Sequence, residues 1–202
     1  VMDIKTGDGA FASDLSKAKA LAESIATVSI GAGVPVCCLI TDMNQPLAPA
    51  MGNALEIVEA MRVLSGETVG RLRSITVSLG AEILKAQKIY NNISQATNEL
   101  ERNLNSGAAL KKFGEMIALM GGPINFGQDF NRYLPEATAV IEVFAPDAGY
   151  LAQWHGQSLG NIVVKLGGGR LVETDQVDHA VGFSEIASIG TCLLYASPSP
   201  RD

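Results

Sequence analysis

The stretch VPVCCLITDMNQPLAPAMGNALEIVEAMRVLSG, residues 34–66, decides the fold of this chain. Residues 34–40 are apolar on both faces, which is typical of a central strand in a parallel sheet covered by helices. A polar loop with two prolines follows over residues 41–53. Residues 53–66 then carry apolar side chains at helical spacing and end at Gly66, a helix stop. Strand, loop and helix in this order predict an α/β domain with right-handed crossovers.

The neighbouring segments extend the same pattern in both directions. VMDIK at residues 1–5 predicts a short buried strand, which a glycine-rich loop connects to a helix with Ser13 as its N-cap. Further helices are expected near residues 71–90, 93–105 and 108–120, separated by glycine breakers. The expected architecture is therefore a partial parallel-sheet α/β domain with helices on both faces.

The residue composition and hydrophobic pattern of the sequence change after residue 135. Residues 138–146 and 149–154 alternate and are rich in β-branched and aromatic side chains, as strands are, and residues 158–170 return to helix and glycine. We therefore predict two domains. Residues 1–135 form part of a large α/β domain, and residues 136–191 form a smaller, incomplete α+β C-terminal domain.

The last eleven residues, CLLYASPSPRD at 192–202, carry no periodicity of the kind seen in the preceding segments. They resemble the translation of a transposon-derived sequencing-library adapter, differing only at Ala196. We therefore expect residues 192–202 to be non-native read-through, although a genuine Ser-Pro tail is the alternative. Because the chain also begins within a strand pattern and without methionine, we expect it to be an internal to C-terminal fragment of a longer protein.

Composition excludes several classes of protein. Hydrophobic residues make up 47% of the 202-residue chain and charged residues 18%, which indicates a globular protein with a buried core. A net charge of −6 without a basic stripe argues against nucleic acid as a partner. No apolar run approaches the ~20 residues that span a bilayer, so no membrane association is expected. Three cysteines suit reduced thiols, and the chain reads as cytoplasmic.

The glycine loop after the first strand is the first candidate site. Glycines at a helix start let backbone N–H groups approach a phosphate. However, GDGAF at residues 7–11 matches neither common phosphate-loop pattern, and Asp8 would repel an anion. A tight turn that presents Phe11 to a flat ligand is the better interpretation.

The loop at residues 41–53 is the more informative candidate. Ligands bind at the carboxyl ends of the strands in open α/β sheets. Glu59, in the helix that follows, could add a carboxylate to a cation held by loop carbonyls, because hard cations take oxygen ligands. From the residues alone, a solvated helix face carrying Glu56 and Glu59 is the favoured alternative.

The remaining reactive side chains are predicted to be structural. His155 and His179 are far apart in the sequence, neither is paired with a cysteine or carboxylate at ligand spacing, and both are expected at the surface or at a strand edge. Cys37 and Cys38 lie inside an apolar run and are expected to be core thiols. GGGR at residues 167–170 is more often a turn than an anion-binding nest.

Four motifs carry a family resemblance: VMDIKTGDGAF, GAGVPVCCLITDMNQPLAPAMGNALEIVEAM, RYLP and LGGGR followed by DHAVGF. They are similar, in unbroken order to about residue 190, to the thymidine and pyrimidine-nucleoside phosphorylase family. The resemblance implies a homodimer with a small helical and a large α/β domain. It also implies a pentosyltransferase, which cleaves thymidine with inorganic phosphate to thymine and 2-deoxyribose 1-phosphate in pyrimidine salvage.

The resemblance also assigns residues. The family's phosphate loop, its catalytic histidine and the side chains that hold the pyrimidine would precede Val1, so no catalytic residue is expected here. Phe11 matches a position that lines the pyrimidine pocket. Leu47 and Ala50, through their carbonyls, and Glu59 match a potassium site. No organic cofactor is implied. If this site exists, the Glu59 carboxylate should lie within ~5 Å of both carbonyls and lack a basic partner.

Three alternatives to thymidine phosphorolysis stay open at this point. One is a broader pyrimidine-nucleoside phosphorylase that also uses uridine. A related phosphoribosyltransferase fits the loop motif less well. The third, from a different class, is a non-catalytic binding fragment.

Overall fold

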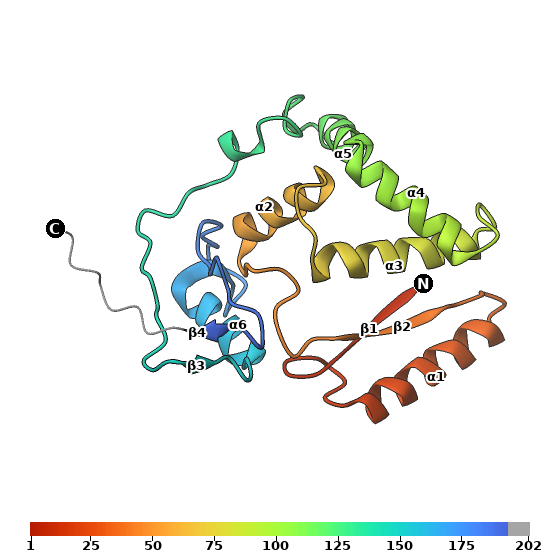
Figure 1. The fold of residues 1–202 in the computed structure, drawn as a ribbon, viewed down its shortest axis with the longest axis horizontal. Helices are drawn as coiled ribbons and strands as arrows, with labels where there is room; N and C mark the ends of the chain where they lie inside the picture. Colours follow the sequence, from red (N-terminus) through yellow and green to blue (C-terminus); the bar gives the residue numbers. More distant parts are fainter. Residues whose placement is uncertain (194–202) are drawn as a thin grey trace.

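The computed structural model describes residues 1–193. Its N-terminal unit is a strand–helix–strand crossover: β1 (Met2–Thr6), α1 (Leu15–Gly31) and β2 (Cys38–Asp42). The two strands pair in parallel, with Met2 opposite Cys38 and Thr6 opposite Asp42. This confirms the predicted parallel α/β arrangement, and Figure 1 shows α1 and α3 on opposite sides of the strand pair.

The core of this unit lies between the strands and α1. Ile4, Ala12 and Ala18 are buried there, and partly buried apolar side chains of α1 and β2 pack against them. On β1, Asp3 and Lys5 alternate with Ile4, and they form a polar network with Thr41 of β2. Lys5 Nζ lies 2.6 Å from Asp3 Oδ2, and the Thr41 hydroxyl donates to Asp3 Oδ1 at 2.6 Å. The strand pair is therefore apolar toward α1 and polar on its other face.

Two local predictions in this unit are wrong. The second strand covers residues 38–42 and not 34–40, because Val34 is exposed, Pro35 has no N–H to donate, and pairing with β1 sets the register. The N-cap of α1 is Asp14 and not Ser13. The Asp14 carboxylate accepts the Lys17 N–H at 2.9 Å.

A helical layer follows, and its positions confirm the sequence prediction closely. It comprises α2 (Asn53–Leu64), α3 (Arg71–Ala86), α4 (Ile93–Asn105) and α5 (Ala108–Leu119). Val63, Val77 and Leu104 form its buried core. A Cβ on Gly80 would lie 2.9 Å from a Leu100 methyl group, so glycine allows α3 and α4 to pack closely.

An ion pair between a buried arginine and a partly exposed glutamate also joins α3 to α4. Arg73 is only 6% exposed and binds the Glu101 carboxylate through Nε, at 3.0 Å, and through Nη2. Its Nη2 group also donates to Asn105 Oδ1 at 2.6 Å. The guanidinium thus has partners on the facing helix, as a buried charge requires.

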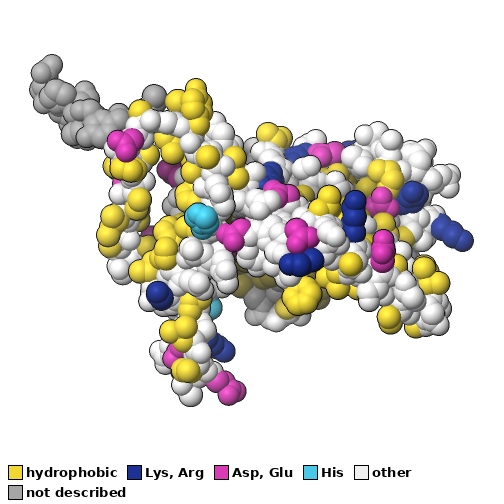
Figure 2. Space-filling model, turned by 90° about the horizontal axis from the view of Figure 1, so that it is seen from below, with side chains coloured by type: hydrophobic (Ala, Val, Ile, Leu, Met, Phe, Trp, Pro, Cys, Tyr) yellow, Lys and Arg dark blue, Asp and Glu magenta, His cyan; other side chains and the backbone are white. Residues whose placement is uncertain are grey.

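The C-terminal segment contains η1 (Phe130–Arg132), β3 (Gly149–Tyr150), α6 (Gly156–Val163), the π-helical turn η2 (Val164–Gly168) and β4 (Cys192–Leu193). β3 and β4 pair antiparallel. The predicted strand at 138–146 is wrong. Val140, Ile141 and Val143 are more than 80% exposed and pair with no strand in the described part of the chain. Figure 2 shows apolar side chains along the extended stretch at the left of the molecule.

Two sequence predictions reach the end of the described chain. Of the stretch predicted to be non-native, Cys192 and Leu193 pair with β3, and residues 194–202 lie outside the described residues. The domain division at 135 and the non-native tail therefore stay predictions. Within residues 1–193, no helix is long and apolar enough to cross a bilayer.

Candidate functional site

The candidate site lies at the carboxyl ends of β1 and β2, where their two loops meet. The Met43 N–H donates to the Thr6 carbonyl at 2.7 Å, and the Asp8 N–H donates to Asn44 Oδ1 at 3.2 Å. Gly7 has φ +123, and a Cβ there would lie 2.6 Å from Asn44 Oδ1. Only glycine therefore allows this approach of the two loops.

A cavity of about 450 Å³ opens beside the glycine loop. Its lining comes from three elements of the chain: Gly7, Asp8, Gly9, Ala10 and Ser13 of the loop, Asn44 after β2, and Gln157 of α6. The loop at the end of β1 thus meets both the loop after β2 and the C-terminal segment. This location agrees with the expectation that ligands bind at the carboxyl edge of the sheet.

Asp8 faces the start of α6. Its Oδ2 atom is buried and has no hydrogen-bond partner among the described residues, and a Cβ on Gly156 would lie 3.9 Å from it. The N-terminal end of a helix favours a negative charge, and α6 has no side-chain N-cap. Asp8 is therefore placed to stabilise this helix start. A carboxylate here agrees with the interpretation that the loop does not cradle phosphate.

Phe11 projects from the same loop and is 93% exposed, while its neighbour Ala12 is 3% exposed. Burying a phenylalanine side chain contributes about 1.5–3 kcal/mol. The ring is therefore a large apolar surface available to a ligand or to another part of a longer protein. Its assignment to a pyrimidine pocket stays a prediction, because no contact tests it.

The loop that carries Leu47 and Ala50 is held by residues 179–186. Met51 and Phe183 exchange two backbone hydrogen bonds, of 2.9 and 2.7 Å, and the Ile186 N–H donates to the Pro49 carbonyl at 2.9 Å. The approach is so close that a Cβ on Gly182 would lie 2.1 Å from the Met51 carbonyl oxygen. The C-terminal segment therefore fixes the shape of this loop.

Glu59 lies in α2, is 7% exposed, and does not have the environment that was expected. Arg62 Nη1 lies 2.7 Å from its Oε1 atom, so the expectation of a carboxylate without a basic partner is wrong. The alternative of a solvated helix face is also wrong for Glu59, because the side chain is buried. The assignment of Leu47, Ala50 and Glu59 as cation ligands stays a prediction. Within residues 1–193, no cluster of three His, Cys, Asp or Glu side chains could hold a metal.

The other candidates take the structural roles expected of them, with one exception. His155 and His179 are exposed. Cys37 and Cys38 are free and only partly buried, so they are not core thiols in the full sense. Burial, followed by the Glu82 carboxylate 3.6 Å from its sulfur, raises the pKa of the Cys37 thiol. Cys37 therefore carries little thiolate at neutral pH.

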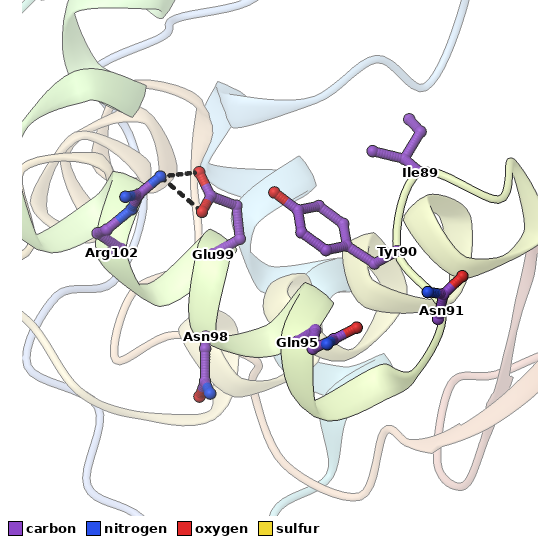
Figure 3. Close-up of a pocket in the computed structure, with 7 residues that line it drawn as sticks. All are labelled: Ile89, Tyr90, Asn91, Gln95, Asn98, Glu99 and Arg102. Carbon is purple, nitrogen blue, oxygen red and sulfur yellow. Dashed lines mark hydrogen bonds and ion pairs between the residues drawn. The ribbon is translucent and has the colours of Figure 1, made fainter.

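The sequence patterns did not indicate a second cavity, of about 480 Å³, between the loop that follows α3 and the exposed side of α4 (Figure 3). Glu99 and Arg102 form an ion pair in its wall, and Arg102 lowers the pKa of Glu99. The remaining lining is Ile89, Tyr90, Asn91, Gln95 and Asn98. The only signal in the sequence was the i, i+3 charge pair, which is common on solvated helices.

Comparison with known proteins relates the sequence of this chain to a family. Residues 150–192 match the model of the pyrimidine nucleoside phosphorylase C-terminal domain. The chain is 42% identical over 199 residues to the thymidine phosphorylase of Rhizobium meliloti, covering 98% of the chain and 45% of that protein. It is 41% identical over 191 residues to the thymidine phosphorylase of Colwellia psychrerythraea, covering 94% of the chain and 44% of that protein.

These matches define the class: the chain belongs to the pyrimidine-nucleoside phosphorylase family. Both relatives compared are thymidine phosphorylases, and their similarity extends over nearly the whole chain. The chain spans a little under half the length of these relatives.

Proposed function

We propose that the intact protein containing this chain catalyses the phosphorolysis of thymidine. Phosphate displaces thymine at the anomeric carbon and gives 2-deoxyribose 1-phosphate. The observation that carries this proposal is the 41–42% identity to two thymidine phosphorylases over nearly the whole chain. We further propose that the intact protein is a cytoplasmic homodimer, and sedimentation of the purified protein tests its subunit number.

In such a reaction the transition state resembles an oxocarbenium ion, and electrostatic stabilisation of the leaving pyrimidine and of the phosphate dominates the rate. The resemblance assigns those charged groups to residues that precede Val1. This chain contributes the wall of the pyrimidine site. The 93% exposed Phe11 ring offers a flat apolar surface to the base, and the hydrogen bonds between the two loops hold its backbone in place.

The direct experiment measures phosphate-dependent release of thymine from thymidine by the purified intact protein. Phe11→Ala should raise KM for thymidine by about tenfold, because aromatic stacking on a base contributes ~1–3 kcal/mol. Phe11→Tyr keeps the flat ring and is the matched control, with KM close to that of the unmodified protein. Absence of phosphate-dependent thymine release would overturn the proposed function, whereas an unchanged KM in Phe11→Ala would remove only the role of Phe11.

The second candidate is a broader enzyme that also cleaves uridine. The matched C-terminal domain, which is named for pyrimidine nucleosides in general, favours considering it. Comparing kcat/KM for thymidine and uridine on the same preparation decides between the two. Comparable values identify the broad enzyme, and a preference of two or more orders of magnitude for thymidine identifies the narrow one.

The 202-residue chain on its own is expected to be a non-catalytic fragment. The groups that bind phosphate and polarise the base are assigned outside it. A preparation of this chain free of host enzyme should therefore release no thymine above a blank. Measurable turnover would show that the assignment of the catalytic groups is wrong.

A further inference from the structure

Glu59 of α2 is a buried carboxylate. It is 7% exposed and lies one turn before Val63, which belongs to the buried core of the helical layer. A carboxylate removed from water needs a positive charge or several hydrogen bonds, because an uncompensated buried charge is strongly destabilising. Glu59 therefore needs a cationic partner close to its carboxylate.

Arg62 supplies it within the same helix. Its Nη1 atom lies 2.7 Å from Glu59 Oε1, at the i, i+3 spacing that brings side chains together on one face. Glu59 is the only side-chain partner of the Arg62 guanidinium among residues 1–193. Arg62 also lies in the last turn of α2, where the helix dipole favours a positive charge.

The hydrogen bonding of the Leu47 and Ala50 carbonyls does not oppose the predicted cation site. Among the described residues, the Leu47 and Ala50 carbonyls accept no hydrogen bond, so no protein donor occupies their oxygen atoms. The positive charge of Arg62 beside Glu59 is the feature that opposes a cation site. A potassium ion on the Glu59 carboxylate would approach a guanidinium that already neutralises it, and like charges at this distance repel.

We propose that Arg62 takes the place of the monovalent cation. In the intact protein its guanidinium provides the counter-charge that the family resemblance assigns to potassium, and the loop at residues 45–52 keeps its shape without a bound ion. The inference concerns the protein for which phosphorolysis is proposed. It nevertheless rests on the Glu59–Arg62 geometry and can be tested without any turnover.

The test compares melting temperatures of the intact protein in KCl and in tetramethylammonium chloride at equal ionic strength. The unmodified protein should melt at the same temperature in both salts. Arg62→Gln should melt about 3–6 °C lower in tetramethylammonium, because it leaves Glu59 buried and unpaired, and potassium should restore at least half of that loss. Arg62→Lys keeps the positive charge and is the matched control, with no response specific to potassium.

A double variant separates charge from packing. Glu59→Gln with Arg62→Gln removes the charge that needs compensation, so it should be more stable in tetramethylammonium than Arg62→Gln alone and should not respond to potassium. A rise in the melting temperature of the unmodified protein specific to potassium would overturn the proposal, as would an Arg62→Gln variant that potassium fails to restore. Should Arg62→Gln not fold, the comparison on the unmodified protein still decides. A protein inactive on thymidine would leave these melting temperatures valid.

Discussion

Gly182→Ala provides the most direct test of how the C-terminal segment holds the candidate site. The added Cβ would lie 2.1 Å from the Met51 carbonyl oxygen and 2.9 Å from a Leu55 methyl group. Both backbones must then separate by more than 1 Å, which breaks the two hydrogen bonds between Met51 and Phe183. At about 1 kcal/mol for each bond and a further contribution from the displaced loop, the local destabilisation is about 2–3 kcal/mol.

Amide hydrogen exchange measured on peptides of the intact protein reads this effect locally. A loss of 2–3 kcal/mol corresponds to exchange about 30–150 times faster in peptides containing residues 49–54 and 181–187. Gly160→Ala is the matched control. It lies in α6 with no atom within 4 Å of its added Cβ, so exchange at residues 49–54 should not change. If Gly182→Ala leaves that exchange within threefold of the unmodified protein, the close approach of the two segments is not what holds the loop.

In urea unfolding of the intact protein, Glu101→Gln should lower the free energy of unfolding by about 3 kcal/mol and Arg73→Met by about 2 kcal/mol. Glu101→Gln leaves a guanidinium that is 6% exposed without its counter-charge, whereas Arg73→Met leaves a carboxylate that is partly hydrated. The reverse order would contradict this reasoning. The backbone N–H of Lys17 lowers the pKa of Asp14 in the folded protein. The ionised Asp14 carboxylate therefore stabilises the fold fully above its unfolded-state pKa near 4, and this stabilisation is lost as the pH falls through the lower, folded-state pKa. The stability difference between the unmodified protein and Asp14→Asn should accordingly shrink only below about pH 4, and a difference that is constant down to pH 2 would exclude the effect. Alkylation of Cys37 at pH 8, followed by mass spectrometry, should be faster in Glu82→Gln, because the carboxylate adds to burial in raising the pKa of the thiol; an unchanged rate would exclude a contribution from Glu82.

The sequence predicted the helical layer well because its signals are local. The periodicity of apolar residues and the glycine breakers locate α2 to α5 within a few residues of their observed ends. The start of α1 was misplaced by one residue, because Ser13 and Asp14 are both good N-caps and only the hydrogen bond to Lys17 distinguishes them.

The strands were predicted less well because a strand needs a partner. Residues 34–40 have the right composition, but pairing with β1 moves the strand to Cys38–Asp42. Residues 138–146 have strong β propensity and form no strand in the structure, since no neighbour pairs with them among the described residues.

The sequence predicts the location of the candidate site but not the residues that contact and hold it. The loop after β2 and the exposed Phe11 follow from the strand–loop–helix pattern and from the glycine loop. The role of residues 179–186 in holding the loop could not be predicted, because no local signal links segments so far apart in the sequence. Arg62 lies at i, i+3 from Glu59 in the sequence, and this spacing favours an ion pair on one helix face over an unpaired carboxylate.

The pairing of Met51 with Phe183 has a consequence for the time at which the site forms. About 130 residues separate the two partners, so closing this contact carries the entropy of a long loop, and the local helices can form first. At synthesis rates of ~5–20 residues per second, the segment that holds the loop leaves the ribosome on the order of ten seconds after the loop itself. The nascent chain therefore carries its strand pair and helical layer well before it carries a finished ligand site.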